Sequence, residues 1–204
     1  MQELILNDQQ RDALQEVANI GAGHASTVLS QMINRNIKMG IPKIEIIPLE
    51  KTREYVKDEK VVVGIFLKIS EEIPCYVLLL IPRDSAFALA YLLMGRSSEE
   101  TISVLSEMDK SALHEVSNVM ICAFFDSLSE LLGLSIIPGP PHLAYDIPDA
   151  VMDYVLIQIG AVANQIVMFN VELSDEQKTG LKINMFLLPL SKSVDVILEK
   201  IGVK

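Results

Sequence analysis

Apolar positions repeat with a helical period in two long segments of the chain. The stretch 9–34 carries apolar or small residues three and four positions apart, which predicts a long amphipathic helix after an N-cap at Asp8. The stretch 106–133 predicts a second such helix, with Ser106 and Asp109 spaced as an N-cap and a first-turn acid. The buried stripe of the first helix is expected to consist of Leu14, Val17, Ala18, Gly21, Ala25, Val28 and Met32.

Shorter patterns predict strands and further helices around these two segments. Apolar runs predict strands over 41–50, 61–69 and 75–81, the last two forming a hairpin, and then a helix over 83–95 that is closed by Gly95. The pattern in the second half is less regular. It gives a break at 138–148, a helix or a strand at 149–160, a hairpin of 164–173 and 181–190 turning at 174–180, and a final helix at 191–201.

The two halves of the chain are similar in sequence. A shift of 99 residues aligns 12–42 with 111–141, and ten of these 31 positions are identical. We interpret this as an internal duplication, with repeats of about 1–100 and 101–204 inside a single domain of residues 1–204. Two α/β halves related by a pseudo-two-fold axis are expected to share one sheet with helices packed on it.

Each repeat places a carboxylate and a carboxamide one turn apart on its helix. Positions i, i+4 and i+7 share one face, so Asp12, Glu16 and Asn19 form a polar row opposite the apolar stripe. A single exposed Glu-x-x-Asn is ordinary, but Asn is a mediocre helix former, and its retention with Glu in both copies favours a function. The corresponding row in the second helix consists of Ser111, Glu115 and Asn118.

Few chemistries need only this pair of side chains. A carboxamide can accept one hydrogen bond and donate another, so it can orient a water for attack without acting as a base. Phosphoryl transfer requires mainly such positioning and charge stabilisation, and a neighbouring carboxylate could bind a lysine. The sequence has no glycine-rich phosphate loop, metal-ligand cluster or nucleophile–base pair. We interpret Gly21 and Gly23 as close helix packing, and any metal or nucleophilic aspartate would have to come from another molecule.

Composition narrows the expected partners and location. The net charge of −10 disfavours nucleic acid and anionic membranes. No apolar run approaches the ~20 residues that cross a bilayer, and no signal-peptide pattern is found, so we expect a cytoplasmic protein. Cys75 and Cys122 are interpreted as buried structural thiols in a reducing compartment, with a disulfide left open.

The repeated residues resemble the CheC family of chemotaxis phosphatases, relatives of CheX and of the middle domain of the flagellar switch protein FliM. The family motif is Asp or Ser, three residues, Glu, two residues, Asn, twenty-two residues and Pro, and it fits this chain twice. The stretch 16–27, EVANIGAGHAST, is also similar to a characteristic stretch of the family. The matching positions are Asp12, Glu16, Asn19 and Pro42 in the first half and Ser111, Glu115, Asn118 and Pro141 in the second.

The resemblance implies an enzyme that hydrolyses the aspartyl phosphate of a CheY-type response regulator. Asn19 and Asn118 would then orient the attacking water, while Glu16 and Glu115 would engage a lysine of the regulator. The protein would carry no cofactor of its own, and Mg²⁺ would stay bound to the regulator. The implied fold is an α/β arrangement with a six-stranded sheet and the two motif helices side by side.

The resemblance also implies a second partner, the deamidase CheD, with Asp146 as a candidate contact. His24 stands where the family more usually has Asn, and little consequence is expected. The main alternative is a non-catalytic adaptor for CheY or CheD, or a scaffold like the flagellar switch. A self-contained metallohydrolase is disfavoured because metal ligands are lacking. Two sites in one chain make a monomer sufficient, so a monomer is expected.

Overall fold

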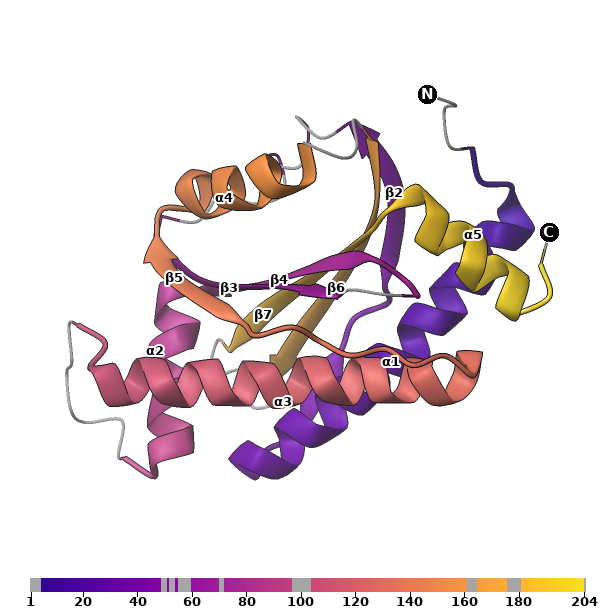
Figure 1. The fold of residues 1–204 in the computed structure, drawn as a ribbon. Coiled ribbons are helices and arrows are strands. Elements are labelled where there is room, and N and C mark those ends of the chain that lie inside the picture. The colour runs from indigo at the N-terminus through magenta and orange to yellow at the C-terminus, as the bar shows by residue number, and fades with distance from the viewer. Residues whose placement is uncertain are drawn as a thin grey trace.

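The computed structural model describes residues 5–48, 51, 54, 60–69, 72–96, 104–160, 165–175 and 181–203. Within them, one antiparallel sheet lies between two helical layers (Figure 1). Among the described residues, helix α4 (Pro148–Gly160) is the helix that covers one face of the sheet. The other face is covered by α1 (Asp8–Ile33), α2 (Arg83–Met94), α3 (Glu107–Leu132) and α5 (Ser191–Lys200).

The sheet contains seven strands arranged in six rows. Its order is β1, β6, β7, β4, β3 and β5, and β2 also pairs with β6. Because β7 occupies the other edge of β6, β1 and β2 lie end to end along a single row. The predicted α/β fold is confirmed, and the expected width of six strands corresponds to these rows. The strands are β1 (Ile37–Met39), β2 (Lys43–Pro48), β3 (Val62–Ile69), β4 (Cys75–Pro82), β5 (His142–Asp146), β6 (Gln165–Asp175) and β7 (Lys182–Pro189).

The two halves of the chain exchange their edge strands. Helices α1 and α3 both have 26 residues and begin 99 positions apart, at Asp8 and Glu107. The strands after α1, β1 and β2, both pair with β6 of the second half, and the strand after α3, β5, pairs with β3 of the first half. The central pair, β4 with β7, joins one strand from each half. This topology supports the division into two repeats, which stays a prediction.

The structure corrects several element boundaries. The N-cap of α1 is Asn7 rather than Asp8, because the Asn7 side chain accepts a hydrogen bond of 2.8 Å from the Gln10 backbone N–H. The segment 138–148, expected only as a break, contains β5, a five-residue edge strand in which exposed and half-buried residues alternate. The undecided segment 149–160 is helical, as α4. Of the predicted turn at 174–180, residues 176–180 lie outside the described residues.

The buried stripe of α1 differs from the predicted one at its C-terminal end. Val28 is only half-buried and Met32 is 40% exposed, whereas Leu29 and Ile33 are buried. A helix advances 3.6 residues per turn, and after Ala25 the core-facing positions continue in steps of four rather than three. The other predicted positions of the stripe are buried, as expected.

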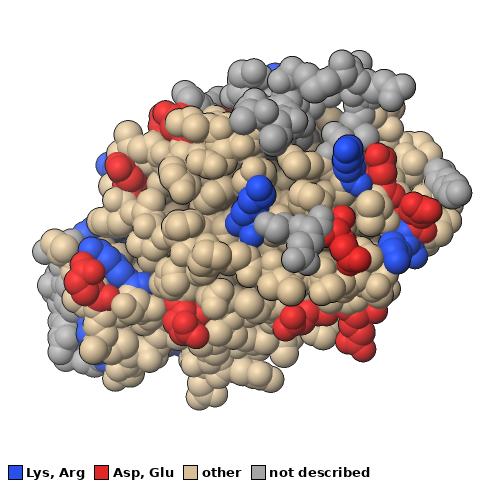
Figure 2. Space-filling view, in the orientation of Figure 1, with Lys and Arg blue, Asp and Glu red and all other residues tan. Residues whose placement is uncertain are grey.

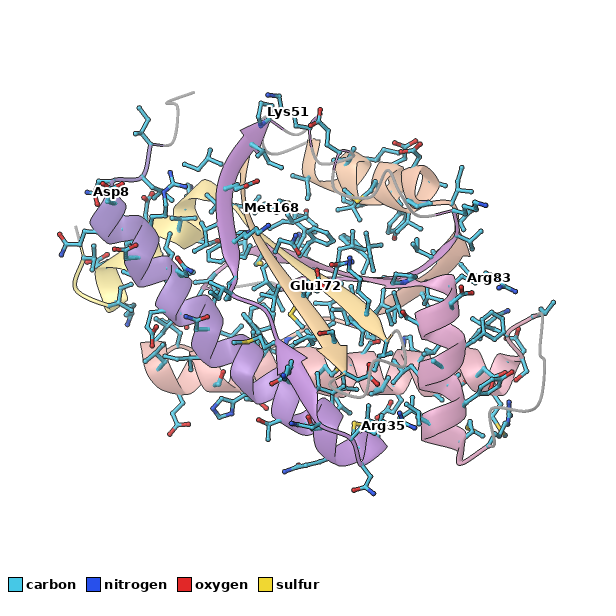
Figure 3. The ribbon with its side chains drawn as sticks, turned by 180° about the vertical axis from the view of Figure 1, so that it is seen from behind. Asp8, Arg35, Lys51, Arg83, Met168 and Glu172 are labelled. Atoms are coloured by element: carbon cyan, nitrogen blue, oxygen red, sulfur yellow. The ribbon has the colours of Figure 1, made fainter. Side chains whose placement is uncertain are left out.

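Helices α1 and α3 pack closely where they cross, on the same side of the sheet. Figure 3 views the molecule from behind and labels Asp8 and Arg35 near the two ends of α1, which runs across α3. A β-carbon on Gly21 would lie 2.6 Å from the ring of Phe124 on α3, so glycine is required for this approach. The predicted packing role is therefore confirmed for Gly21. It is wrong for Gly23, around which no atom lies within 4 Å of an added β-carbon.

Candidate functional site

Both motif helices present the same polar row in the same setting. Glu16 and Glu115 are exposed, and Asn19 and Asn118 are half-buried. The first position of each row, Asp12 or Ser111, is also exposed. Between these polar positions lie residues that anchor each helix in the core, namely Leu14 and Val17 on α1 and Leu113 and Val116 on α3. Each helix is thus fixed by its apolar face and displays its carboxylate and carboxamide outward.

The loop after each motif helix passes close to a strand of the other half. The Gly40 N–H donates to the Glu172 carbonyl at 2.8 Å, and the Gly139 N–H donates to the Lys68 carbonyl at 3.0 Å. A β-carbon would lie 3.4 Å from that oxygen at Gly40 and 2.8 Å at Gly139. The distance at Gly139 is too short for any side chain, so glycine is required there, whereas the distance at Gly40 is an ordinary van der Waals contact.

The motif prolines come two residues later, where the chain enters an edge strand. Pro42 is buried and Pro141 is half-buried. The Pro141 carbonyl lies 3.0 Å from Nε2 of His114, which places this residue beside the motif helix α3. On the first helix, Arg11 Nη1 donates to the Ile44 carbonyl at 3.1 Å. Each edge strand is therefore tied to the helix that carries its motif, although by different side chains.

The N-terminus of α3 is held by a buried charge that α1 lacks. The Asp109 side chain accepts hydrogen bonds from Ser106, at 2.6 Å from its hydroxyl and 2.9 Å from its backbone N–H. Arg96 also forms an ion pair with Asp109 at 2.8 Å. Burial by itself would raise the pKa of the Asp109 carboxyl, but the Ser106 hydrogen bonds and the Arg96 charge together hold it below its usual value. At the start of α1, the corresponding bonds between Asn7 and Gln10 are exposed.

The two carboxamides have different neighbours. Asn19 Nδ2 donates to Glu16 Oε2 at 3.5 Å, whereas Asn118 Oδ1 accepts from the Cys122 thiol at 3.9 Å. Burial raises the pKa of Cys122, and the nearby carboxylates of Asp126 and Glu115 raise it further. The neutral thiol is therefore the form present near neutral pH.

The cysteines fit the prediction only in part. Both are free, so they form no disulfide with each other. Cys75 is buried as expected, and burial raises the pKa of its thiol to about 12. Cys122 is only half-buried and touches a predicted site residue. Sequence reasoning missed this contact, although Cys122 lies at i+4 from Asn118, a spacing at which helix side chains meet.

Asp146 lies apart from both motif rows. It is the exposed last residue of β5, and its Oδ1 accepts a hydrogen bond of 2.7 Å from the Ile147 N–H. With His142 and Tyr154 it borders a pocket of about 310 Å³ between α4 and the edge of the sheet. Helix α4 covers the sheet face opposite α1 and α3, so this pocket and the motif rows belong to different sides of the molecule.

The surface over α3 is acidic. Figure 2 shows acidic side chains spaced along this part of the molecule, and no continuous basic patch among the described residues in that view. Glu115, Asp126 and Glu130 are all exposed on α3. Within the described residues, no group of three or more His, Cys, Asp or Glu side chains could hold a metal ion, and His24 is exposed on α1. No helix among them is both long and apolar enough to cross a membrane.

Comparison with known proteins agrees with these features. The model of the CheC-like family matches residues 10–46, which include the first motif from Asp12 to Pro42. The CheY-P phosphatase CheC of Bacillus subtilis (strain 168) is 27% identical over 201 residues, which cover 97% of this chain and 96% of that protein. The chain is thus similar to the CheC-like family in its first motif and to a CheC protein over nearly its whole length. The resemblance inferred from the sequence is confirmed.

Solved structures of other proteins share the fold. Thermotoga maritima FliY superposes with a TM-score of 0.76 at 23% identity, covering 97% of this chain and 98% of that chain. The FliM middle domain from H. pylori gives a TM-score of 0.66 at 14% identity, covering 96% and 99%. At these sequence identities, structural similarity shows a shared fold and does not show a shared function. A choice between an enzyme and a scaffold therefore depends on the side chains of the motif rows.

Proposed function

We propose that this protein is a phosphatase that hydrolyses the aspartyl phosphate of a CheY-type response regulator. The observation that carries the proposal is the pair of Glu–Asn rows, which have the same spacing and the same exposure on two equivalent helices. The chemotaxis phosphatase that is similar over nearly the whole chain supports the same reaction.

In this mechanism the carboxamide acts as a positioning group. The half-buried Asn19 or Asn118 would enter the partner's phosphorylated site and hold a water in line with the phosphorus atom. The carboxamide oxygen accepts a hydrogen bond from that water and takes up no proton, so the uncharged side chain positions the water without acting as a base. The metal and the phosphorylated carboxylate are contributed by the regulator.

The carboxylate of each row would dock the partner. Glu16 and Glu115 are exposed one turn before the carboxamides, where each could pair with a lysine beside the phosphorylated aspartate. The acidic surface along α3 and the net charge of −10 would favour approach of a basic region around that lysine. The buried apolar side chains hold each helix on the core and so limit the motion of both polar groups.

The test is the lifetime of a phosphorylated CheY-type regulator in the presence of the protein. Wild type should shorten the lifetime, and the double variant Asn19→Ala, Asn118→Ala should lower the acceleration by about a hundredfold or more, as the loss of a preorganised catalytic hydrogen bond does. Gln31→Ala, which removes an exposed carboxamide elsewhere on α1, is the matched control and should act like wild type. Full activity in a folded double variant would rule out this mechanism.

A second candidate role, which can coexist with the first, is that of an adaptor for a CheD-type deamidase. We propose that this partner binds beside α4, where Asp146 borders a pocket and where Ile147 and Ile157 are 52% and 72% exposed. The charge and the apolar area together suit a partner surface with a basic and an apolar part. CheD should be retained by wild type and by Asp195→Ala but not by Asp146→Ala. Equal retention by all three would exclude this contact.

A further inference from the structure

The two motif rows differ at the position one turn beyond each carboxamide. The equivalent residues there are Gly23 on α1 and Cys122 on α3, which are 99 positions apart. An added β-carbon at Gly23 would have no atom within 4 Å, so the space beside Asn19 is open. On α3 the same place is filled by a thiol, whose sulfur lies 3.9 Å from Asn118 Oδ1.

The chemistry of the neighbours determines which end of each carboxamide is held. A carboxylate can only accept, so Glu16 engages the NH₂ group of Asn19. A neutral thiol can donate, so Cys122 engages the carbonyl oxygen of Asn118. Among the described residues, no hydrogen bond joins Glu115 to Asn118, which leaves the second carboxylate unengaged by its own carboxamide. The two side chains are therefore held by opposite ends.

The thiol is suited to act as a donor under physiological conditions. Burial raises the pKa of Cys122, and the carboxylates of Asp126 and Glu115 add to this effect. A carbonyl oxygen has two lone pairs, so Asn118 Oδ1 can accept from the thiol and still accept from a water. The contact can therefore restrict rotation of the carboxamide without blocking the proposed role.

We propose that Cys122 is a positioning residue of the second site, whose thiol orients the Asn118 carboxamide for hydrolysis and leaves Glu115 to bind the partner. The first site works without such a residue, because Gly23 occupies the equivalent position and Glu16 holds Asn19 instead. This inference rests on the proposed phosphatase function, and it concerns the turnover of one of the two sites.

The test isolates the second site in an Asn19→Ala background and measures kcat and KM with a phosphorylated CheY-type regulator. Adding Cys122→Ala should lower kcat about threefold to fivefold, the equivalent of one weak hydrogen bond, while KM stays unchanged. Adding Cys122→Ser should keep most of kcat, because a hydroxyl also donates. Thermal unfolding of each variant checks that the fold is intact.

The outcomes separate the two hypotheses. If kcat of the folded Cys122→Ala variant equals that of its parent, or if Cys122→Ser falls as far as Cys122→Ala, the positioning role is overturned. If wild type accelerates dephosphorylation but the Asn19→Ala parent does not, the second site is inactive and this inference alone fails. If wild type itself gives no acceleration, the proposed function fails and the positioning role fails with it.

Discussion

Helices α1 and α3 have the same length and the same row of polar groups, yet they are held in different ways. Both start with a capping box, formed by Asn7 and Gln10 on α1 and by Ser106 and Asp109 on α3. The bonds of the first box are exposed, whereas Asp109 is buried and paired with Arg96. Residues common to the two helices form the buried apolar face and the outward-facing Glu–Asn row. Residues that differ set how firmly each helix end is fixed.

The largest expected difference concerns the helix starts. Asp109→Ala leaves the Arg96 guanidinium and the Ser106 groups without their partner, and it should lower the free energy of unfolding by about 3 kcal/mol. The matched variant on α1, Gln10→Ala, removes only an exposed hydrogen bond and should cost less than about 1 kcal/mol. Urea unfolding of both variants measures the difference. Equal losses would show that the buried pair adds nothing to the stability of α3.

The crossing of the two helices gives a second contrast, between glycines two residues apart. Gly21→Ala would place a methyl group 2.6 Å from the Phe124 ring, and we expect a destabilisation of about 2 kcal/mol from overpacking. Gly23→Ala is the control, because its β-carbon meets no atom within 4 Å. It should be neutral or stabilise by up to about 1 kcal/mol through helix propensity. A stability at Gly21→Ala equal to wild type would mean that the helices separate without cost.

Much of this architecture could be predicted from the sequence because it follows from periodicity. Both long helices, the hairpin of β3 and β4 and the Glu–Asn rows were evident from apolar spacing and the shift of 99 residues. Strand β5 was missed because its five residues alternate only between exposed and half-buried, with prolines before it. The pairing of each edge strand with the other half is a long-range choice that no local pattern encodes.

The surroundings of the site were harder to predict than the site residues. The two motifs give the positions of Asn19 and Asn118 but not what their carboxamides touch. The Cys122 contact depends on side-chain rotamers and on partial burial against the core. The ion pair of Arg96 with Asp109 joins the residue just after α2 to the first turn of α3. The sequence between the two residues does not predict this pair. Spacing thus predicts which groups share a face, and packing decides which of them interact.

The smallest of the three expected effects on stability is a difference in pH dependence between the helix starts. The folded-state pKa of Asp109 lies below its usual value of 3.8, so its contribution is fully present above that value and is lost as the pH falls through the lower, folded-state pKa. Unfolding free energies of wild type and Asp109→Asn should therefore differ at pH 7 and converge below pH 3.8.

The capping box of α1 is the control for this measurement, because Asn7 and Gln10 carry no ionisable side chain. The difference between wild type and Gln10→Ala should stay constant over the same pH range. Protonation of Asp109 keeps the volume of the side chain and part of its hydrogen bonding. The free energy of unfolding that wild type loses on acidification should therefore be smaller than the free energy lost in Asp109→Ala. A gap between wild type and Asp109→Asn that does not change with pH would mean that charge contributes nothing at α3. Any difference between the two helix starts would then come from packing and neutral hydrogen bonds.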